Sequence, residues 1–416
     1  MTVISTNSFN GNDLSVLNGP PALVSTVPCI LVAGGAGYIG SNTVLEILMQ
    51  DDEPDWNVVV VDNLCTSSCS NLVDAQRLAG KKIVAFHHVD LTDKLALEKV
   101  FRLHPNIWAV MHFASGKSVP ESWSNPLMYY NVNLGSTLNL LENALVPASP
   151  SPHVLKKRIH FVFSSSACTY GSALDEHDYG FNTPGGPHGV PETTPLRPMN
   201  PYGRTKVYNE EIFRDCCTLH DGYNDQNVVL KAAMLRYFNP VGAHESGYMG
   251  ENTQGKEPPN LVPIVTRFAA RSLRAKMGLP NENKSTAFKM FGGAWPTPDG
   301  APIRDFLHIT DLAKAHTAAL RRLVTLEDAD DGAGNGTGAT GGNAGKGRER
   351  QRGWNYLVYN IGCGSGYSVR EVVKTVERIS GVEIPIDVVP KRDGDAGIAI
   401  SDPKKAYREL GWKTEK

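Results

Sequence analysis

Tyr202 and Lys206 are the residues of this sequence whose types and spacing are best suited to proton transfer. Pro201 stops an incoming helix, and a helix that begins there carries the phenol and the ammonium four residues apart, on one face. A buried cation beside a phenol stabilises the phenolate and lowers its pKa from about 10, so the pair can act as a general base near neutral pH. From this spacing alone, a surface helix with the two side chains next to each other is the simpler alternative.

A glycine-rich turn near the start of the sequence has the form of a dinucleotide-binding loop. Cys29–Val32 is typical of a short buried strand, and a helical apolar pattern follows from Val44. Between them, glycines at positions 34, 35, 37 and 40 satisfy the G-x-G-x-x-G spacing and its looser form. Such glycines let backbone amides approach a pyrophosphate at a helix N-terminus.

An acidic residue follows at the distance that this role requires. A second apolar strand, residues 58–61, ends at Asp62, which stands 22 positions after Gly40. An acid there binds the hydroxyls of the adenosine ribose. Its carboxylate repels a 2′-phosphate, and the next residues, Asn63 and Leu64, offer no arginine to receive one. We therefore predict that the cofactor is NAD and not NADP.

Strand and helix patterns alternate through the first half of the chain. Residues 83–88, 109–113 and 159–163 are expected to be further strands. Alternation with short connections predicts an α/β fold with a doubly wound parallel sheet of the Rossmann type. Ligands bind at the carboxyl ends of such strands, which is where Lys117 and the serines 164–166 are expected to lie.

Composition argues against several classes of protein. The chain of 416 residues has a formal net charge of -2 and a pI of about 6.6, so nothing suggests nucleic acid or an anionic membrane as a partner. The uncharged stretch 14–45 is interrupted by prolines and glycines, and we do not interpret it as a membrane span. Residues 1–27 contain no lysine or arginine, so we expect a disordered leader and not a targeting signal.

The cysteines indicate the redox environment. The seven cysteines are scattered and odd in number, which favours a reducing, cytoplasmic compartment. Cys65 and Cys69 have no second cysteine or histidine pair nearby, so no metal site is expected.

Two segments have the composition of insertions. Residues 176–189 are rich in glycine, proline and histidine. Residues 328–353 have an acidic start, a middle of glycine, asparagine and threonine, and a basic end. Because this composition cannot form a core, we predict that 328–353 is a disordered loop.

Several separate motifs together resemble one enzyme family. They are the glycine turn, Asp62, His112-Phe113-Ala114, the serines 164–166, the Tyr202/Lys206 pair and Arg236-Tyr237-Phe238-Asn239-Pro240. This combination is similar to that of the extended short-chain dehydrogenase/reductase superfamily and, more narrowly, of UDP-glucose 4-epimerases. The resemblance covers the chain from about residue 29 onward. Ala33 departs from it, because the family usually has threonine there, which affects turn packing more than chemistry.

The resemblance implies a division of the chain into an NAD-binding part and a substrate-binding part. After the leader 1–27, residues 28–240 are expected to form the NAD-binding Rossmann domain, completed by segments that return from the later chain. Residues 241–416 are expected to form a smaller C-terminal α/β lobe that binds a UDP-hexose, interrupted by the insertion 328–353. A homodimer is expected on the resemblance alone.

The same resemblance assigns residues to each ligand. Those implied around NAD are Gly34, Gly37, Tyr38, Ile39, Gly40, Asp62, Asn63, Asp90, Leu91, Phe113, Ala114, Lys117, Asn133, Ser164, Tyr202, Lys206 and Tyr237. Those implied around the UDP-sugar are Lys117, Ser166, Tyr202, Phe238, Asn239, Asn260, Leu261, Phe291, Arg304, Arg392, Asp395 and Ala399. The planar fork of arginine suits Arg304 and Arg392 to phosphate oxygens.

The activity implied is the interconversion of UDP-galactose and UDP-glucose through a 4-keto intermediate, with NAD kept tightly bound. Tyr202 takes the proton of the sugar 4-hydroxyl while hydride leaves C4. Lys206 and the positive nicotinamide ring keep the phenol deprotonated, and Ser166 relays the proton. Ala399 stands where a bulky tyrosine excludes a 2-acetamido group in such epimerases, so UDP-GlcNAc and UDP-GalNAc are predicted to be accepted as well.

Two alternatives are considered. Another NAD-dependent nucleotide-sugar enzyme, such as a 4,6-dehydratase or a decarboxylase, would share fold and cofactor, but a dehydratase needs a further acid and base beside Ser166. Ala167 and Cys168 stand there, without a carboxylate. A non-catalytic NAD(H)-sensing module is possible on any such fold, yet it has no reason to retain Ser166, Tyr202 and Lys206 together.

Overall fold

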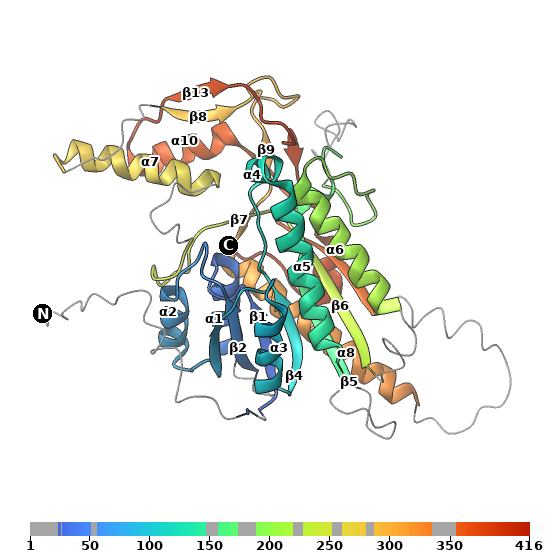
Figure 1. The fold of residues 1–416 in the computed structure, drawn as a ribbon. Coiled ribbons are helices and arrows are strands. Elements are labelled where there is room, and N and C mark those ends of the chain that lie inside the picture. Colours follow the sequence, from blue (N-terminus) through green and yellow to red (C-terminus); the bar gives the residue numbers. More distant parts are fainter. Residues whose placement is uncertain are drawn as a thin grey trace, which may run out of the picture.

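Short apolar runs of the sequence pair into one parallel sheet at the centre of the molecule (Figure 1). The computed structural model describes residues 24–25, 27–50, 56–146, 157–173, 189–218, 228–251, 260–279, 287–334 and 355–416. Its main sheet has seven strands in the order β11-β6-β5-β4-β1-β2-β3, and every neighbouring pair is parallel. The strands are β1 (Cys29–Ala33), β2 (Asn57–Asp62), β3 (Ala85–His88), β4 (Ile107–His112), β5 (Lys157–Ser164), β6 (Val228–Tyr237) and β11 (Tyr356–Ile361).

The order of the strands confirms the doubly wound α/β fold. The five strands predicted from the sequence are β1 to β5, with ends shifted by at most two positions. From β1 the sheet grows through β2 and β3 on one side and through β4, β5, β6 and β11 on the other. This reversal lies between β1 and β4, and the carboxyl ends of the strands flanking such a reversal form a ligand crevice.

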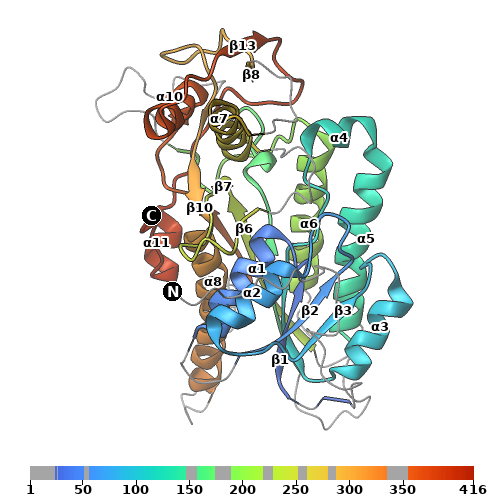
Figure 2. The same cartoon turned by 90° about the vertical axis from the view of Figure 1, so that its left-hand side faces the viewer.

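Helices cover both faces of the sheet, which explains why its strands are continuous apolar runs in the sequence. Figure 2 shows the sheet between these two layers of helices. One layer contains α3 (Lys94–Leu103), α5 (Pro126–Ala144) and α6 (Pro201–Thr218). The other contains α1 (Tyr38–Leu48), α2 (Ser70–Ala79), α8 (Ile309–Gly334) and α11 (Lys404–Leu410).

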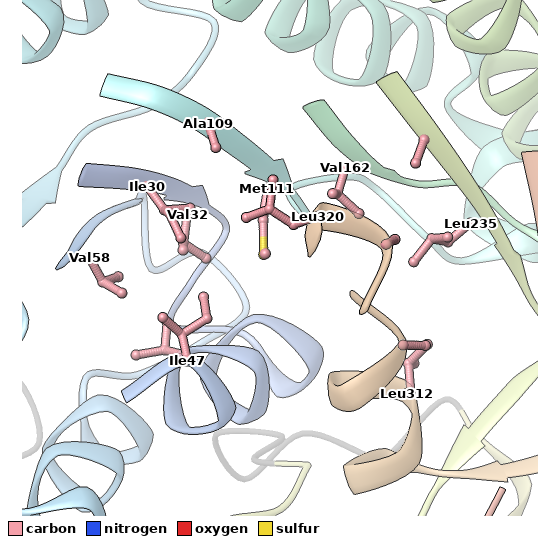
Figure 3. Close-up of a cluster of buried hydrophobic side chains, with 14 of the residues drawn as sticks. Ile30, Val32, Ile47, Val58, Ala109, Met111, Val162, Leu235, Leu312 and Leu320 are labelled. Atoms are coloured by element: carbon pink, nitrogen blue, oxygen red, sulfur yellow. The ribbon is translucent and has the colours of Figure 1, made fainter. Parts of the chain in front are cut away.

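The core on the α1/α8 face joins distant parts of the sequence (Figure 3). Ile47 of α1 and Leu312 and Leu320 of α8 belong to one buried cluster with Val32 of β1 and Met111 of β4, and each is at most 2% exposed. Burial of each such side chain contributes about 1.5–3 kcal/mol to folding. Because α8 and β11 come from the second half of the chain, the later sequence returns to complete this layer and the edge of the sheet.

A smaller lobe lies beyond the carboxyl ends of the strands, at the top of Figure 1. Val265, Met290 and Val373 are buried in its separate core. A capping box of Ser368 and Glu371 begins its second helix. Its elements are α7 (Leu261–Lys276), β8 (Phe288–Phe291), α10 (Val369–Ser380) and β13 (Ile386–Val389).

Several short strands complete the described fold. β7 (Asn239–Val241) pairs with β10 (Phe306–His308) in parallel. β9 (Ile303–Arg304) lies between β12 (Tyr367–Ser368) and β14 (Ile398–Ala399).

The expected disordered segments fall largely outside the described residues. Of the leader 1–27, positions 24, 25 and 27 are described, and the Ser25 N–H donates to the Leu103 oxygen at 2.9 Å. The segment 176–189 lies outside the described residues except at its last position.

The prediction of a loop over 328–353 is wrong at its beginning. Helix α8 continues to Gly334. Alanine and acidic residues in this stretch are compatible with a helix, and glycine is where it ends. Residues 335–353 lie outside the described residues.

No helix within the described ranges is long and apolar enough to cross a membrane. The seven cysteines are free thiols. Likewise, no three His, Cys, Asp or Glu side chains gather as a metal site in the part of the chain that the structure describes.

Candidate active site

The glycine turn after β1 is pressed against the ends of β2 and β4. Gly34 has a φ of +79°, and its N–H donates to the Val61 oxygen at 2.8 Å. A Cβ on Gly34 would lie 2.6 Å from the Ala114 nitrogen, and a Cβ on Gly40 would collide with the Gly34 carbonyl. Helix α1 then begins at Tyr38 without a side-chain cap or an acidic residue in its first turn. This narrow cradle at an uncapped helix N-terminus fits a dinucleotide pyrophosphate.

Asp62 shapes this turn from the end of β2. Its Oδ2 accepts a hydrogen bond from the Ala36 N–H at 3.0 Å. Its Oδ1 accepts from the Leu64 N–H at 2.8 Å and from the Ser67 hydroxyl at 2.9 Å. The structure thus places Asp62, the residue predicted to bind the ribose, beside the glycine turn. Asp62 also holds the loop together, a role that the spacing did not indicate.

Other residues predicted to line the NAD-binding edge follow the ends of β2, β3 and β4 or lie in the first turn of α1. Asn63 Nδ2 donates to Asp90 Oδ2 at 2.8 Å, and Leu91 beside it is buried. The Phe113 N–H donates to the Ala33 oxygen at 2.8 Å. Ile39, in the first turn of α1, packs partly buried against the core.

Asn133 ties three parts of the site together. Its Oδ1 accepts from the Gly116 N–H at 2.8 Å, and its Nδ2 donates to the Gly116 oxygen at 3.1 Å. The same Nδ2 donates to the Thr205 hydroxyl at 2.9 Å. Asn133 of α5 therefore positions the loop that carries Lys117 against α6. This positioning role comes in addition to the predicted role of Asn133 as a cofactor-binding residue.

Tyr202 and Lys206 lie in the first turns of α6, as their spacing predicts. Both are buried, with exposed fractions of 6% and 2%. Lys206 Nζ donates a hydrogen bond of 2.7 Å to the backbone oxygen of Ser164, at the end of β5. The ammonium lies 5.7 Å from the centre of the Tyr202 ring and 4.8 Å from that of Phe163. The alternative of a surface helix is thereby excluded.

Burial controls the protonation of both groups. It raises the pKa of Tyr202 well above its ordinary value; Tyr237 and Cys168 act in the same direction, and a hydrogen bond with Ser166 acts against it. Burial also lowers the pKa of Lys206 to about 7. The expectation of a phenol ionised near neutral pH relies on two cations, Lys206 and the nicotinamide ring, and in the chain without NAD burial acts on the phenol in the opposite direction. Ionising the phenol requires further positive charge in the site.

The three serines after β5 have different partners. The Ser164 hydroxyl lies 3.2 Å from His316 Nε2, and Ser165 donates to Glu210 at 2.5 Å. Ser166 caps the short 3-10 turn η2 (Ala167–Thr169) by accepting from the Cys168 N–H at 3.2 Å. Only Ser166 among them is joined by a hydrogen bond to Tyr202 in the part of the chain that the structure describes. This is the serine that the sequence predicts to serve the reaction.

Residues predicted to bind the UDP-sugar gather where the lobe meets α6. The Arg392 guanidinium lies 4.3 Å from the centre of the Phe291 ring, and its Nε donates to Asp395 Oδ2 at 3.0 Å. Asn200, just before α6, donates to the Gly394 oxygen at 3.4 Å. The start of the Tyr202 helix is thereby tied to the loop that carries Arg392.

A second group lies along β9 and β14. Arg304 of β9 is in register with Ala399 of β14. Ala399 is partly buried and packs against a cluster that contains the buried Phe238. Asn239 Nδ2 donates to the Asp305 oxygen at 3.1 Å.

Comparison with known proteins agrees with this geometry. Residues 30–331 match the "NAD dependent epimerase/dehydratase family". The chain belongs to this family. It is similar to the "UDP-glucose 4-epimerase" of Dictyostelium discoideum, 40% identical over 386 residues, which are 92% of this chain and 90% of the relative. The "UDP-glucose 4-epimerase" of Bacillus subtilis is 38% identical over 393 residues, 93% of this chain and 92% of the relative.

Solved structures of the epimerase/dehydratase type have the same fold. That of the UDP-glucose 4-epimerase from Bifidobacterium longum, in complex with NAD+ and UDP, has a TM-score of 0.70 and 34% identity, and covers 93% of this chain and 94% of that one. The structure from Stenotrophomonas maltophila, with bound NAD and formylated UDP-arabinopyranose, has a TM-score of 0.69, 34% identity and 94% coverage of both chains.

Glu251 belongs to the candidate site, although the sequence did not predict it as a site residue. Glu251 Oε1 accepts from Lys117 Nζ at 2.9 Å and from Asn260 Nδ2 at 2.9 Å. Asn260 stands at the N-cap of α7, directly before Leu261, and its side chain makes no capping hydrogen bond. One carboxylate thus links a predicted cofactor residue to a predicted substrate residue. No spacing in the sequence signals this contact.

The sequence singled out Cys168, in η2, only because it offers no carboxylate beside Ser166. Burial raises the pKa of its thiol. Ser166 and the charges of Arg304, Asp395 and Lys206 also act on the thiol. The Cys168 thiol is therefore neutral, and the charges that act on it come both from Lys206 and from two residues predicted to bind the UDP-sugar.

Proposed function

We propose that this chain is a UDP-glucose 4-epimerase that interconverts UDP-galactose and UDP-glucose. The observation that carries the proposal is the buried Tyr202/Lys206 pair beside Ser166, at the carboxyl end of the sheet. The glycine cradle lies along the same edge of the sheet, and the Arg304 and Arg392 groups approach from the lobe side. The family membership and the relatives' printed activity support the same reading.

The chain's own residues would move and place a proton. NAD, held by the glycine cradle and Asp62, would supply the hydride acceptor for C4 and a further positive charge. Tyr202 accepts the proton of the sugar 4-hydroxyl. Ser166, which is hydrogen-bonded to Tyr202, also forms a hydrogen bond with the sugar 4-oxygen and relays the proton. Tyr202 later returns the proton to the oxygen of the inverted C4 centre.

Lys206 would hold its place and its charge during this transfer. Its hydrogen bond to the Ser164 oxygen fixes the ammonium within 5.7 Å of the phenol ring centre. A cation at this distance favours the phenolate over the phenol. Because burial opposes both charges, a second cation in the site is needed to bring the phenol's pKa toward neutrality.

The lobe would grip UDP more firmly than the hexose. Arg304 and Arg392 suit the pyrophosphate, while Phe291, packed under Arg392, suits the uridine side. A hexose held loosely can rotate and present its other face before hydride returns. The small Ala399 leaves room beside the sugar, so we include UDP-GlcNAc and UDP-GalNAc among the substrates.

The assembly is proposed to be a homodimer in a reducing, cytoplasmic compartment. Helices α5 and α6 lie side by side (Figure 1) and carry exposed apolar side chains, with Leu127 82%, Leu138 44% and Tyr208 47% exposed. Such a face suits a second copy of the chain. A monomer mass by light scattering would contradict the dimer.

The seven free thiols support the proposal of a reducing, cytoplasmic compartment.

The experiment that tests the activity begins with what the purified protein holds. Mass spectrometry of small molecules released on denaturation is expected to detect NAD together with a UDP-hexose. An undenatured sample of the same protein is then given UDP-galactose, added NAD and a dehydrogenase that consumes only UDP-glucose. Continuous reduction of the added NAD by the dehydrogenase is expected as UDP-glucose forms. Release of NADP, or no product after NAD and UDP-galactose are added, would refute the proposal.

A further inference from the structure

Glu210 shares the face of α6 that carries the reacting pair. Tyr202, Lys206 and Glu210 stand at intervals of four residues, so all three side chains line one side of the helix. Glu210 is fully buried, which is rare for a glutamate unless it is paired. Its contacts explain how it is kept there.

The Glu210 carboxylate joins α6 to two strand ends. Its Oε1 accepts from the Ser165 hydroxyl at 2.5 Å and from Arg236 Nε at 2.9 Å. Its Oε2 pairs with Arg236 Nη2 at 2.5 Å, and these side chains are 0% and 3% exposed. Ser165 lies between the lysine's acceptor, Ser164, and the proton-relaying Ser166.

Arg236 extends this network away from the reacting atoms. Its Nη1 donates to the Tyr170 hydroxyl at 3.0 Å, and that hydroxyl donates to Asn360 Oδ1 at 2.6 Å. Strands β5, β6 and β11 are thereby connected to α6 through buried hydrogen bonds.

Stability alone does not account for an ion pair at this place. A buried pair loses hydration, and well-packed apolar residues often serve folding as well or better. A buried polar network does, however, select one arrangement of the elements that it joins. Here the elements are the helix with Tyr202 and Lys206 and the strand end with the serines.

We propose that Glu210 is a positioning residue for the epimerase reaction, fixing the rotation of α6 so that Lys206 reaches the Ser164 oxygen and Tyr202 reaches Ser166. This inference rests on the proposed function and adds a residue that touches neither substrate nor cofactor. Its negative charge has a second effect, because it favours the protonated form of Lys206 against burial. The other titratable groups that act on or face the ammonium are His112 from β4, Cys168 after β5 and Tyr202 on the same helix.

The test compares Glu210→Gln with Glu211→Gln. Glu211 is the next residue of the same helix, 47% exposed and paired with Arg214. Glu210→Gln is expected to lower kcat for UDP-galactose about tenfold or more, to change KM by less than about twofold, and to leave NAD content unchanged. The alkaline limb of its pH–activity profile is also expected to shift to lower pH, because Lys206 loses its proton more readily. Glu211→Gln is expected to match the unmodified protein in all four measurements.

Ser165→Ala keeps the test decisive if Glu210→Gln does not fold, because it leaves the Glu210–Arg236 pair intact. A fall in kcat of about threefold or more, with KM and NAD content unchanged, is expected. If the Glu210 variant, or the Ser165 variant in its place, kept kcat within about twofold, the positioning role would be overturned. Failure of the proposed function is distinguishable, because the unmodified protein would then not turn over UDP-galactose at all.

Discussion

The ammonium of Lys206 lies 2.7 Å from the backbone oxygen of Ser164, so the helix that carries the base is fastened to the strand that carries the serines. A backbone carbonyl oxygen does not titrate and cannot rotate away as a side chain can, and it therefore holds the lysine in one place. The lysine's own protonation is left to burial and to neighbouring charges, which bring its pKa to about 7. The same contact links the chemistry of the site to the stability of the protein.

Lys206 is expected to make the cofactor-free protein more stable as pH rises. Its folded pKa is about 7, and that of free lysine is about 10.4, so between these values the unfolded chain binds more protons. The free energy of unfolding therefore increases with pH in this window. Urea unfolding at about pH 7 and about pH 8.5 should show this gain, and Lys206→Met should reduce it by up to about 2 kcal/mol.

The control for this prediction is Lys404→Met, since the Lys404 side chain is 81% exposed. It should retain the pH dependence of the unmodified protein. An identical pH dependence in Lys206→Met would show that Lys206 is not the group responsible.

Cofactor choice is expected to depend on Asp62. The unmodified protein should bind NAD at least about 100-fold more tightly than NADP, because a 2′-phosphate would be brought against the carboxylate. Asp62→Asn keeps a hydrogen-bond acceptor for the Ala36 N–H and should narrow that ratio. Titration of protein fluorescence with each cofactor measures both affinities. Equal affinity of the unmodified protein for the two cofactors would contradict the role given to Asp62.

The size of residue 399 is expected to control the 2-acetamido substrates. Ala399→Tyr should lower kcat/KM for UDP-GalNAc by about tenfold or more and change that for UDP-galactose by less than about threefold. Ala399→Ser is the matched control and should act on both sugars as the unmodified protein does. A protein that turns over UDP-galactose but not UDP-GalNAc would refute the predicted range of substrates.

The part of the insertion that follows α8, residues 335–353, is expected to be dispensable for folding and activity. Residues 335–353 are polar and rich in glycine, a composition that offers little apolar surface for burial, and loop closure costs rise slowly with length. Replacing them by a short Gly/Ser link should keep Tm within about 3 °C and kcat within about twofold. Aggregation or loss of activity in the shortened protein would show that the insertion packs against or assembles something.

Local patterns in the sequence predicted most of the framework. The strands up to β5, the glycine turn, Asp62 and the Tyr202/Lys206 pair depend on spacing within a few tens of residues. Glu251, Cys168 and the Glu210–Arg236 pair were missed because their contacts join separate parts of the chain. The effect of burial on the pKa values of Tyr202 and Lys206 could not be predicted from the sequence, because burial is a property of the fold.

The most direct test of the account is turnover of UDP-galactose by the unmodified protein and by Tyr202→Phe. The substitution removes the phenol oxygen but keeps the ring, so NAD and UDP binding should persist. The account predicts steady conversion to UDP-glucose by the unmodified protein and a kcat at least about 100-fold lower in Tyr202→Phe, with the Kd for UDP changed by less than about threefold. A Tyr202→Phe protein that kept more than about a tenth of the activity would contradict the role of Tyr202 as the proton acceptor.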